Sequence, residues 1–483
     1  MAKARLVFLE SSEEELIHQQ SLRCLAEIGI LVKSEKVLRM LEQYGAYVDF
    51  TTMIAKIPEA IVEKALASAP KKIRLCARDP NHDLEIPVDG IPFSATNGLS
   101  PFVLDLETGK TRKSTRADLA SFTRLADALE PVDYQWTALT ATDVPARTHG
   151  AHEIWVTLQN TSKHVQGVTV ESALDARKQI ELAALIAGGE KELKKRPLIS
   201  IISCPIAPLT FEKGAIEAQT EFAKAGIPIL SMSMSLAGQS SPVTLAGTIV
   251  NSNAENLASL VITQAASAGA PHIYTTESTP VDMKTATINY SAPELPLISA
   301  ASGQMARRYE LPCMVGNLGT SNSVPGLPSS FSEIAVGCLS TFAGNDLVAG
   351  MGSIDVAMAC SMEQLVIDAN FWENFRIFMR RFTINRESCA LDIMKEVGHG
   401  HSFIAHPHTV ENFRKELHFW DKEKLGMQAT LSTEMVPAAR ETARKLLREH
   451  EVAALDSDLI AQGDEILKFY EQESTSHGGR GRA

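Results

Sequence analysis

Short apolar runs alternate with longer stretches of helical periodicity along most of the chain. Each run ends in small or polar residues where a helical pattern begins, which is typical of parallel βα units. The pattern predicts eight strands, at Tyr134–Thr142, Lys163–Val170, Leu198–Cys204, Pro228–Ser235, His272–Glu277, Pro312–Leu318, Asp346–Met351 and Ser402–His406. Eight such units predict an α/β fold of the (β/α)8 TIM barrel type, in which the loops after the strands build the active site.

The remaining periodicity divides the chain into four parts. Residues 1–114 predict an N-terminal addition, helical from Ser11 to Ala69 and a small β meander from Ile73 to Lys113, where Asn-Gly and Asp-Gly pairs signal turns. We expect the barrel itself at 115–452 and one further amphipathic helix at 453–472. Apart from the final alanine, residues 473–483 carry no apolar side chain that could pack against a folded domain. We therefore expect this tail to be disordered.

Composition narrows the class of protein. The chain of 483 residues is 45% hydrophobic and carries a formal net charge of −12, without the basic stripe of a nucleic-acid binder. Its seven cysteines include no CxxC pair and are odd in number, which favours reduced thiols. No apolar run is long enough for a membrane span, and the acidic N-terminus does not read as a signal peptide, so we expect a cytoplasmic protein.

The strand ends select the candidate site residues, because only these positions face the barrel mouth. They include Asp143, Gln166, Met232, Met234, Glu277, Asn317, Gly350, Met351, His406 and His408. An acidic pair, Asp143 and Glu277, would favour a cationic ligand, and each carboxylate has a salt bridge as its alternative role. Aromatic side chains near strand ends would hold a quaternary ammonium by cation–π attraction, and the candidates are Phe93, Phe102, Trp136, Tyr274, Phe371 and Trp372. Met232 and Met234 share one face of their strand, either the lumen or the outer core.

The residues at the predicted strand ends give little support for a metal site or a phosphate-binding site. His406-Pro-His408 offers one or two ligands, but a single histidine pair seldom makes a metal site, and hydrogen bonding at the rim is the alternative. Gly350-Met-Gly352 is the one turn with a weak phosphate-loop character. We therefore expect no intrinsic metal, which disfavours a metal-dependent hydrolase.

Several stretches resemble one known family. They are Asn97-Gly98 with Leu104–Gly109, Thr161–His164, Ser241–Gly247 with Asn253–Glu255, Glu363–Asp368 and His406–Thr409. In this order, over nearly the whole chain, they resemble the trimethylamine methyltransferase family. The resemblance implies a TIM barrel that moves a methyl group from a methylated amine to the cobalt of a corrinoid, which a separate partner protein carries.

One loop sets this chain apart within that family. Founding members carry pyrrolysine after the sixth strand, in the loop that here is Gly316–Pro328 and has none. The resemblance therefore implies the branch without pyrrolysine, whose donors are quaternary amines: glycine betaine as first choice, with proline betaine or carnitine as alternatives. A cobalt(I) nucleophile and a neutral leaving amine need no metal or base, so the protein has to orient the methyl group and exclude water.

On this reading the residues divide into two sets. Glu277, Asn317 and His408 are the catalytic candidates, and Asp143, Phe93, Trp136, Tyr274, Phe371, Met232, Met234, Gly350, Met351 and His406 contact the substrate. We also expect a homo-oligomer. The rival hypotheses are a barrel that binds a betaine without catalysis and an ordinary barrel lyase or hydrolase.

Overall fold

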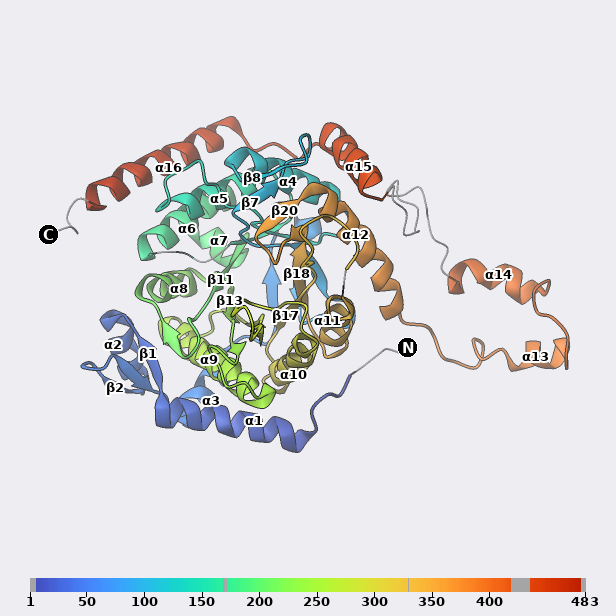
Figure 1. Cartoon of the computed structure of the whole chain (residues 1–483), viewed down its shortest axis with the longest axis horizontal. Helices are drawn as coiled ribbons and strands as arrows, with labels where there is room; N and C mark the ends of the chain where they lie inside the picture. The colour runs from blue at the N-terminus through green and yellow to red at the C-terminus, as the bar shows by residue number, and fades with distance from the viewer. Residues whose placement is uncertain (1–5, 168–169, 171, 329, 418–434, 479–483) are drawn as a thin grey trace.

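Eight parallel strands close into a barrel in the computed structural model, which describes residues 6–167, 170, 172–328, 330–417 and 435–478 (Figure 1). In order around the barrel they are β6 (Phe93–Thr96), β9 (Tyr134–Trp136), β10 (His164–Gly167), β11 (Ile199–Ser203), β13 (Ile229–Ser233), β15 (His272–Thr276), β17 (Cys313–Asn317) and β18 (Leu347–Met351). The TIM barrel prediction is confirmed.

One of the eight predicted strands is wrong. Residues Ser402–His406 form a turn, and the barrel instead closes through β6, which pairs in parallel with both β18 and β9. The barrel therefore begins inside the segment 1–114 that was assigned to the addition, and the strand predicted to be sixth, β17, is the seventh. Four residues of β6 carry too little periodicity to stand out from the neighbouring meander.

The outer ring consists of the helices that follow the strands. They are α4 (Arg116–Ala128), α5 (His149–Gln159), α6 (Ala173–Ala187) with α7 (Glu190–Lys195), α8 (Lys213–Ala225), α9 (Leu245–Ala266), α10 (Glu294–Arg308), α11 (Phe331–Phe342) and α12 (Met362–Arg376), which continues into η3 (Ile377–Met379). Several begin at a side-chain cap, and Thr115 and Asp118 form a reciprocal capping box at the start of α4.

The N-terminal addition is helical, as predicted, and packs against α9 and α10. It contains α1 (Ser11–Arg23), the π-helical turn η1 (Cys24–Ile28), α2 (Glu35–Tyr44) and α3 (Glu59–Ser68), with strands β1 (Ile30–Val32), β2 (Tyr47–Asp49) and β3 (Ile54–Lys56). β1 pairs with β12 (Thr210–Phe211) from the loop after β11, which attaches the addition to the barrel. Buried residues of α1–α3 and of α9 share one apolar core.

Three small sheets lie at the two ends of the barrel. The hairpin β4 (Ile73–Leu75) and β5 (Leu84–Ile86), separated by η2 (Pro80–His82), packs under the lumen with Leu230 and Ile273. Short strands in the loops shape the other end, where the active site of such a barrel lies. They are β7 (Phe102–Leu104), β8 (Thr111–Lys113), β14 (Leu236–Ala237), β16 (Thr279–Pro280), β19 (Ser353–Ile354) and β20 (Ala359–Ser361).

The chain after α12 leaves the barrel and returns to it. α13 (Leu391–Val397) and α14 (Pro407–Glu416) project away from the body, and α15 (Met435–Glu449) packs again on α12 and α4 (Figure 1). α16 (Ser457–Gly478) lies along α6, so the tail predicted to be disordered from residue 473 is helical to Gly478. The rest of that tail, 479–483, lies outside the described residues.

Two further observations concern the chain as a whole. None of the seven cysteines, all within the described ranges, forms a disulfide. Among the described residues, no helix combines the length and apolar character that a membrane crossing needs.

Candidate active site at the barrel mouth

The upper lumen of the barrel is lined by alternate residues of the parallel strands. Parallel register places Trp136 beside Gln166 and Met232 beside Thr275, and adjacent residues in register share one face of a sheet. Tyr134 donates from its hydroxyl to Met314 Sδ at 3.5 Å across the lumen, which identifies this face as the interior. Glu277 follows Thr275 by two residues and therefore points inward at the mouth.

Glu277 is the central polar group of this mouth. Its side chain is 6% exposed, the Tyr290 hydroxyl donates to Oε2 at 3.3 Å, and the Asn317 amide donates to Oε1 at 3.4 Å. Burial raises the pKa of the carboxyl to about 7, and the two hydrogen bonds oppose the shift only in part. No cationic side chain among the described residues pairs with Glu277, so a bound cation would meet an uncompensated acidic group.

Tyr290 and Asn317 reach Glu277 from different loops. Tyr290 lies in the segment before α10, thirteen residues beyond Glu277, and sequence reasoning missed it because no strand ends there. Burial, followed by the nearby Glu277 carboxyl, raises the pKa of Tyr290 well above its ordinary value, so this hydroxyl keeps its proton and acts as a donor.

The Asn317 side chain is held by close backbone packing. Gly319 N donates to Asn317 Oδ1 at 2.5 Å, which leaves the amide NH2 for Glu277. Gly350 has φ +119° on the adjacent strand, and a Cβ there would lie 2.1 Å from Asn317 Oδ1. Gly350 thus serves the close approach of two strands, and neither phosphate nor substrate is needed to explain it.

Two lumen side chains have buried polar atoms without partners. Trp136 Nε1, Gln166 Nε2 and Gln166 Oε1 find no hydrogen bond among the described residues, although Trp136 is 5% and Gln166 0% exposed. Such atoms cost about 1–3 kcal/mol each unless a ligand or water satisfies them. The indole packs directly on Gly98, where a Cβ would come within 2.2 Å of Trp136 Cε2. The Asn-Gly pair at 97–98 therefore makes room for this ring.

Two loops form a wall beside this group and enclose a small cavity of about 10 Å³, close to the space that one water molecule needs. Its lining includes Tyr290, Asn317, Thr320, Ser353, Val356 and Ala357. The loop after β17, where the family resemblance placed pyrrolysine, is anchored from behind. The Glu333 carboxylate accepts from Ser321 N at 2.9 Å, and the Gln364 side chain accepts from Gly326 N at 2.8 Å and donates to Gly326 O at 3.0 Å.

The turn between β19 and β20 is strained. Asp355, Val356 and Ala357 have φ values of 55°, 54° and 64°, a left-handed run that costs about 1–2 kcal/mol per residue for L-amino acids. Asp355 N donates to Asn322 O at 2.6 Å, and Ser100 Oγ donates to Ala357 O at 2.8 Å, so neighbouring loops hold the turn in place. Strain of this kind gathers at functional sites.

The structure brings several predicted residues to the mouth. Glu277, Asn317, Trp136, Met232 and Met234 all belong to it, and the two methionines pack in the lumen with Trp136. Phe93 also faces the lumen, but from the first residue of β6, at the opposite end of that strand from the mouth.

Four predicted residues face away from the lumen. Tyr274 points outward, where its hydroxyl donates to Asn253 Oδ1 at 3.1 Å. Met351 packs outside the barrel with Phe122 and Leu365, because a register shift in β18 turns it from the lumen face. Phe371 lies on α12, where its ring stacks on Phe375.

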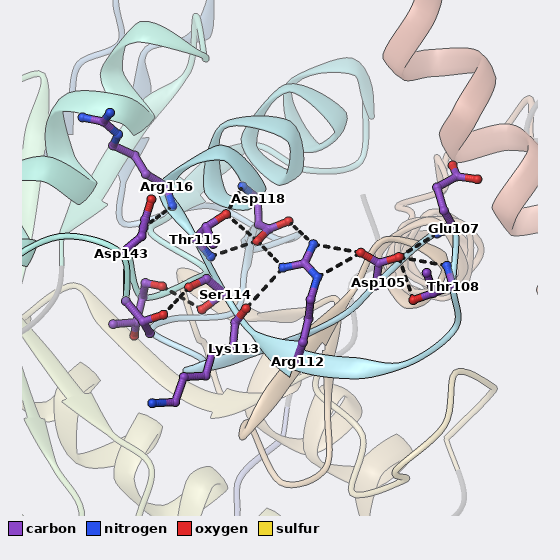
Figure 2. A network of polar contacts seen from close by, with 12 residues as sticks. Asp105, Glu107, Thr108, Arg112, Lys113, Ser114, Thr115, Arg116, Asp118 and Asp143 are labelled. Carbon is purple, nitrogen blue, oxygen red and sulfur yellow. Dashed lines mark hydrogen bonds and ion pairs between the residues drawn. The ribbon is translucent and has the colours of Figure 1, made fainter.

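Asp143 is the fourth, and it is a surface cap. Its carboxylate accepts from Arg116 N at 2.7 Å at the first turn of α4, beside the network of Arg112 with Asp105 and Asp118 (Figure 2). The predicted pairing of Asp143 with Glu277 is therefore wrong, since Asp143 is exposed and satisfied elsewhere.

His406 and His408 lie on the segment that projects from the barrel. His406 caps α14, where its Nδ1 accepts from His408 N at 3.1 Å, and its Nε2 lies 3.4 Å from Glu396. The prediction that His406 and His408 lie at the mouth is wrong, because it depended on the predicted strand Ser402–His406, which forms a turn. In the described ranges no three His, Cys, Asp or Glu side chains gather as metal ligands would.

Comparison with known proteins gives the family. Residues 2–474 match the model of the trimethylamine methyltransferase (MTTB) family. The chain is 34% identical over 408 residues to trimethylamine methyltransferase MttB of Desulfitobacterium hafniense (strain DSM 10664 / DCB-2), which covers 84% of this chain and 82% of that protein. It is 27% identical over 467 residues to the glycine betaine methyltransferase of Desulfitobacterium hafniense (strain Y51), covering 94% and 95% of the two chains.

A solved structure agrees in fold. The crystal structure of the hydroxylamine MtmB complex superposes with a TM-score of 0.50 at 12% identity and covers 91% of this chain and 92% of that one, a likeness that shows the fold alone. Because the family model matches residues 2–474 of its 483 residues, this chain belongs to the trimethylamine methyltransferase family.

Proposed function

We propose that the chain is a quaternary amine:corrinoid protein methyltransferase, with glycine betaine as the first candidate donor. The observation that carries the proposal is Glu277, a buried carboxyl without a cationic partner at the mouth of the barrel. A quaternary ammonium supplies the missing positive charge and cannot donate a hydrogen bond, so it needs only charge and apolar or aromatic surface. Trp136, Met232 and Met234 provide that surface.

A zwitterionic donor explains the unpaired atoms of the same lumen. Trp136 Nε1 and Gln166 Nε2 are buried donors without acceptors, and a substrate carboxylate would accept from both. Glu277 would then hold the ammonium end. The loop Gly316–Pro328 has no pyrrolysine, and a relative that aligns with 94% of this chain is a glycine betaine methyltransferase.

In the reaction the corrinoid acts as the methyl acceptor and reaches the mouth on its own protein. Cobalt(I) would supply the electron pair of the new Co–CH3 bond; the C–N bond would break with its electron pair remaining on nitrogen, and a tertiary amine would leave. No proton moves, so the chain needs no general acid or base. Its residues fix the orientation of the methyl group and exclude water, and the Tyr290 and Asn317 donors keep Glu277 in place for the ammonium.

Anaerobic mixing with cob(I)alamin tests the proposal. The purified protein is combined in turn with glycine betaine, proline betaine, carnitine and trimethylamine, and the cobalt absorbance is followed. Methylcobalamin with a quaternary amine and none with trimethylamine is the expected result. Turnover of trimethylamine alone would overturn the donor class, and calorimetric binding of a betaine without any transfer would favour a binding protein.

A further inference from the structure

The first turns of α12 hold the loop after β17 through two buried polar side chains, Gln364 and Asp368. The Gln364 side chain accepts from Gly326 N at 2.8 Å and donates to Gly326 O at 3.0 Å. Its amide also donates to Asp368 Oδ1 at 2.7 Å, so both amide hydrogens are used. Gln364 therefore grips the main chain of the loop, and Asp368 fixes the orientation of Gln364.

Asp368 also holds the end of β18. Its second oxygen, Oδ2, accepts from Gly352 N at 2.8 Å. Gly352 lies two residues beyond Gly350, the glycine that packs closely on Asn317 Oδ1. One carboxylate on α12 thus joins the two segments that enclose Asn317, which are the end of the neighbouring strand and the loop that follows Asn317 itself. We call the four hydrogen bonds of Gln364 and Asp368 the clamp.

The clamped loop reaches the candidate site at two points. At its start, the Asn317 amide donates to Glu277 Oε1. Further along, Ser321 Oγ accepts from Ser291 Oγ at 2.9 Å, and Ser291 is the neighbour of Tyr290, the second donor to Glu277. A displacement of the loop therefore bears on both hydrogen bonds of the Glu277 carboxyl.

The helix α12 does not need the clamp for its own stability. Ser361 Oγ already accepts from Gln364 N as the cap of α12, and Glu363 pairs with Arg440 of α15. Asp368 is 7% exposed, burial raises its pKa to about 8, and no cationic side chain among the described residues pairs with it. A buried carboxyl of this kind is costly, and an apolar side chain would pack on the helix without that cost.

We propose that Gln364 and Asp368 are positioning residues for methyl transfer, which hold the loop Gly316–Pro328 so that the methyl group of a bound quaternary amine points at the cobalt. This inference rests on the function proposed above. The attraction between a cation and Glu277 changes little when the loop shifts slightly. The transfer step is far more sensitive, because a misplacement of about 1 Å costs about 100-fold in rate. Loss of the clamp should therefore lower kcat more than it weakens binding.

Two single variants and their combination test the clamp. Asp368→Asn sets an NH2 group against one of two donors, and Gln364→Glu sets a carboxylate against Asp368. Each should lower kcat for transfer to cob(I)alamin about tenfold or more, with the calorimetric dissociation constant of glycine betaine within about threefold of the wild type. In the double variant the amide at position 368 accepts from Gly352 N and donates to the carboxylate at 364, which accepts from Gly326 N. Three of the four hydrogen bonds return, so kcat should recover to within about threefold.

Asp346→Asn is the matched control. Asp346 is 2% exposed, and its carboxylate accepts from two backbone amides, Val88 N and Cys313 N, each at 2.8 Å. It precedes β18, at the end of that strand opposite to the mouth. Asp346→Asn should lower the thermal midpoint as Asp368→Asn does, because both lose a buried hydrogen bond, but it should leave kcat unchanged.

Hydrogen exchange of residues 316–328 reports on the loop without any methyl donor. Exchange should be faster than in the wild type for Asp368→Asn and Gln364→Glu, and unchanged for Asp346→Asn. Unchanged exchange in both clamp variants, an equal loss of kcat in Asp346→Asn, or a double variant no faster than the single ones would each overturn the proposal. A wild-type chain that transfers no methyl group would overturn the proposed function and with it the role in transfer, and the exchange result would then still decide whether the clamp holds the loop.

Discussion

The barrel mouth and the projecting segment 378–417, called the arm here, depart from ordinary burial in opposite directions. At the mouth, an acidic group and several polar atoms are buried without full compensation, as Glu277 and Gln166 show. On the arm, large apolar side chains such as Phe378 and Ile404 stay in water. Each arrangement costs free energy in the isolated chain. On our proposal a quaternary amine relieves the cost at the mouth, whereas none of the described residues buries α13 or α14.

Removing the charge of Glu277 tests the mouth most severely. Glu277→Gln keeps the size of the side chain but loses the negative charge, and we expect kcat/KM for the quaternary amine to fall by about 100-fold, or about 2.7 kcal/mol. Methyl transfer to cob(I)alamin measures the change. Asp143→Asn is the matched control, because Asp143 caps α4 at the surface, and it should leave transfer unchanged.

The backbone contact behind Asn317 is tested through Gly350. Gly350→Ala combines a positive φ with overlap on Asn317 Oδ1, so we expect it to lower the free energy of unfolding by about 2–3 kcal/mol. Chemical denaturation measures this value. Gly109→Ala provides the comparison, since Gly109 has φ +65° with nothing within 4 Å; it should cost about 1 kcal/mol, and an equal cost for both variants would refute the overlap.

The pH dependence of substrate affinity follows from the raised pKa of Glu277. The carboxyl is protonated below pH 7 in the free protein, and a bound cation favours the ionised form, so binding strengthens as pH rises toward 7 and levels off above it. At pH 6 the dissociation constant should be about tenfold above its plateau. Calorimetry of Glu277→Gln should show a flat profile, although Asp346 and Asp368, whose pKa values burial also raises, to about 7 and about 8, are retained.

Two ligands, one with a carboxylate and one without, test whether the unpaired amide of Gln166 binds the carboxylate of the substrate. Gln166→Leu removes the amide and keeps an apolar side chain of similar size, so the affinity for glycine betaine should fall five- to tenfold, by about 1–1.4 kcal/mol. Tetramethylammonium has no carboxylate and should bind equally well to both forms. Gln239→Leu at an exposed loop residue is the control, and equal losses for both ligands would remove the carboxylate role of Gln166.

The smallest effect is expected at the histidines of the arm. His408→Ala should change kcat/KM by less than about twofold, because the arm projects away from the mouth of its own chain. A loss comparable to that of Glu277→Gln would show that the arm reaches a barrel mouth, and would reverse the separation between these two regions.

The sequence by itself determined the barrel and part of its mouth. Seven of the eight strands were predictable because parallel strands are buried on both faces and appear as continuous apolar runs. Glu277, Asn317 and Trp136 could be placed at the mouth for the same reason, since each ends or follows such a strand. The helices of the N-terminal addition and the capping of α4 at Thr115 were equally local.

Tertiary structure alone decided the closing strand and the rest of the site. β6 is recognisable only through its pairing with β18 and β9, which lie far from it in sequence or beyond a long helix. Tyr290 joins Glu277 from a loop, and a register shift turns Met351 outward, although local sequence marks neither. His406 and His408 resemble strand-end residues in sequence but lie on the arm. Local patterns report burial and periodicity, whereas which loops meet above a barrel depends on contacts between residues distant in the chain.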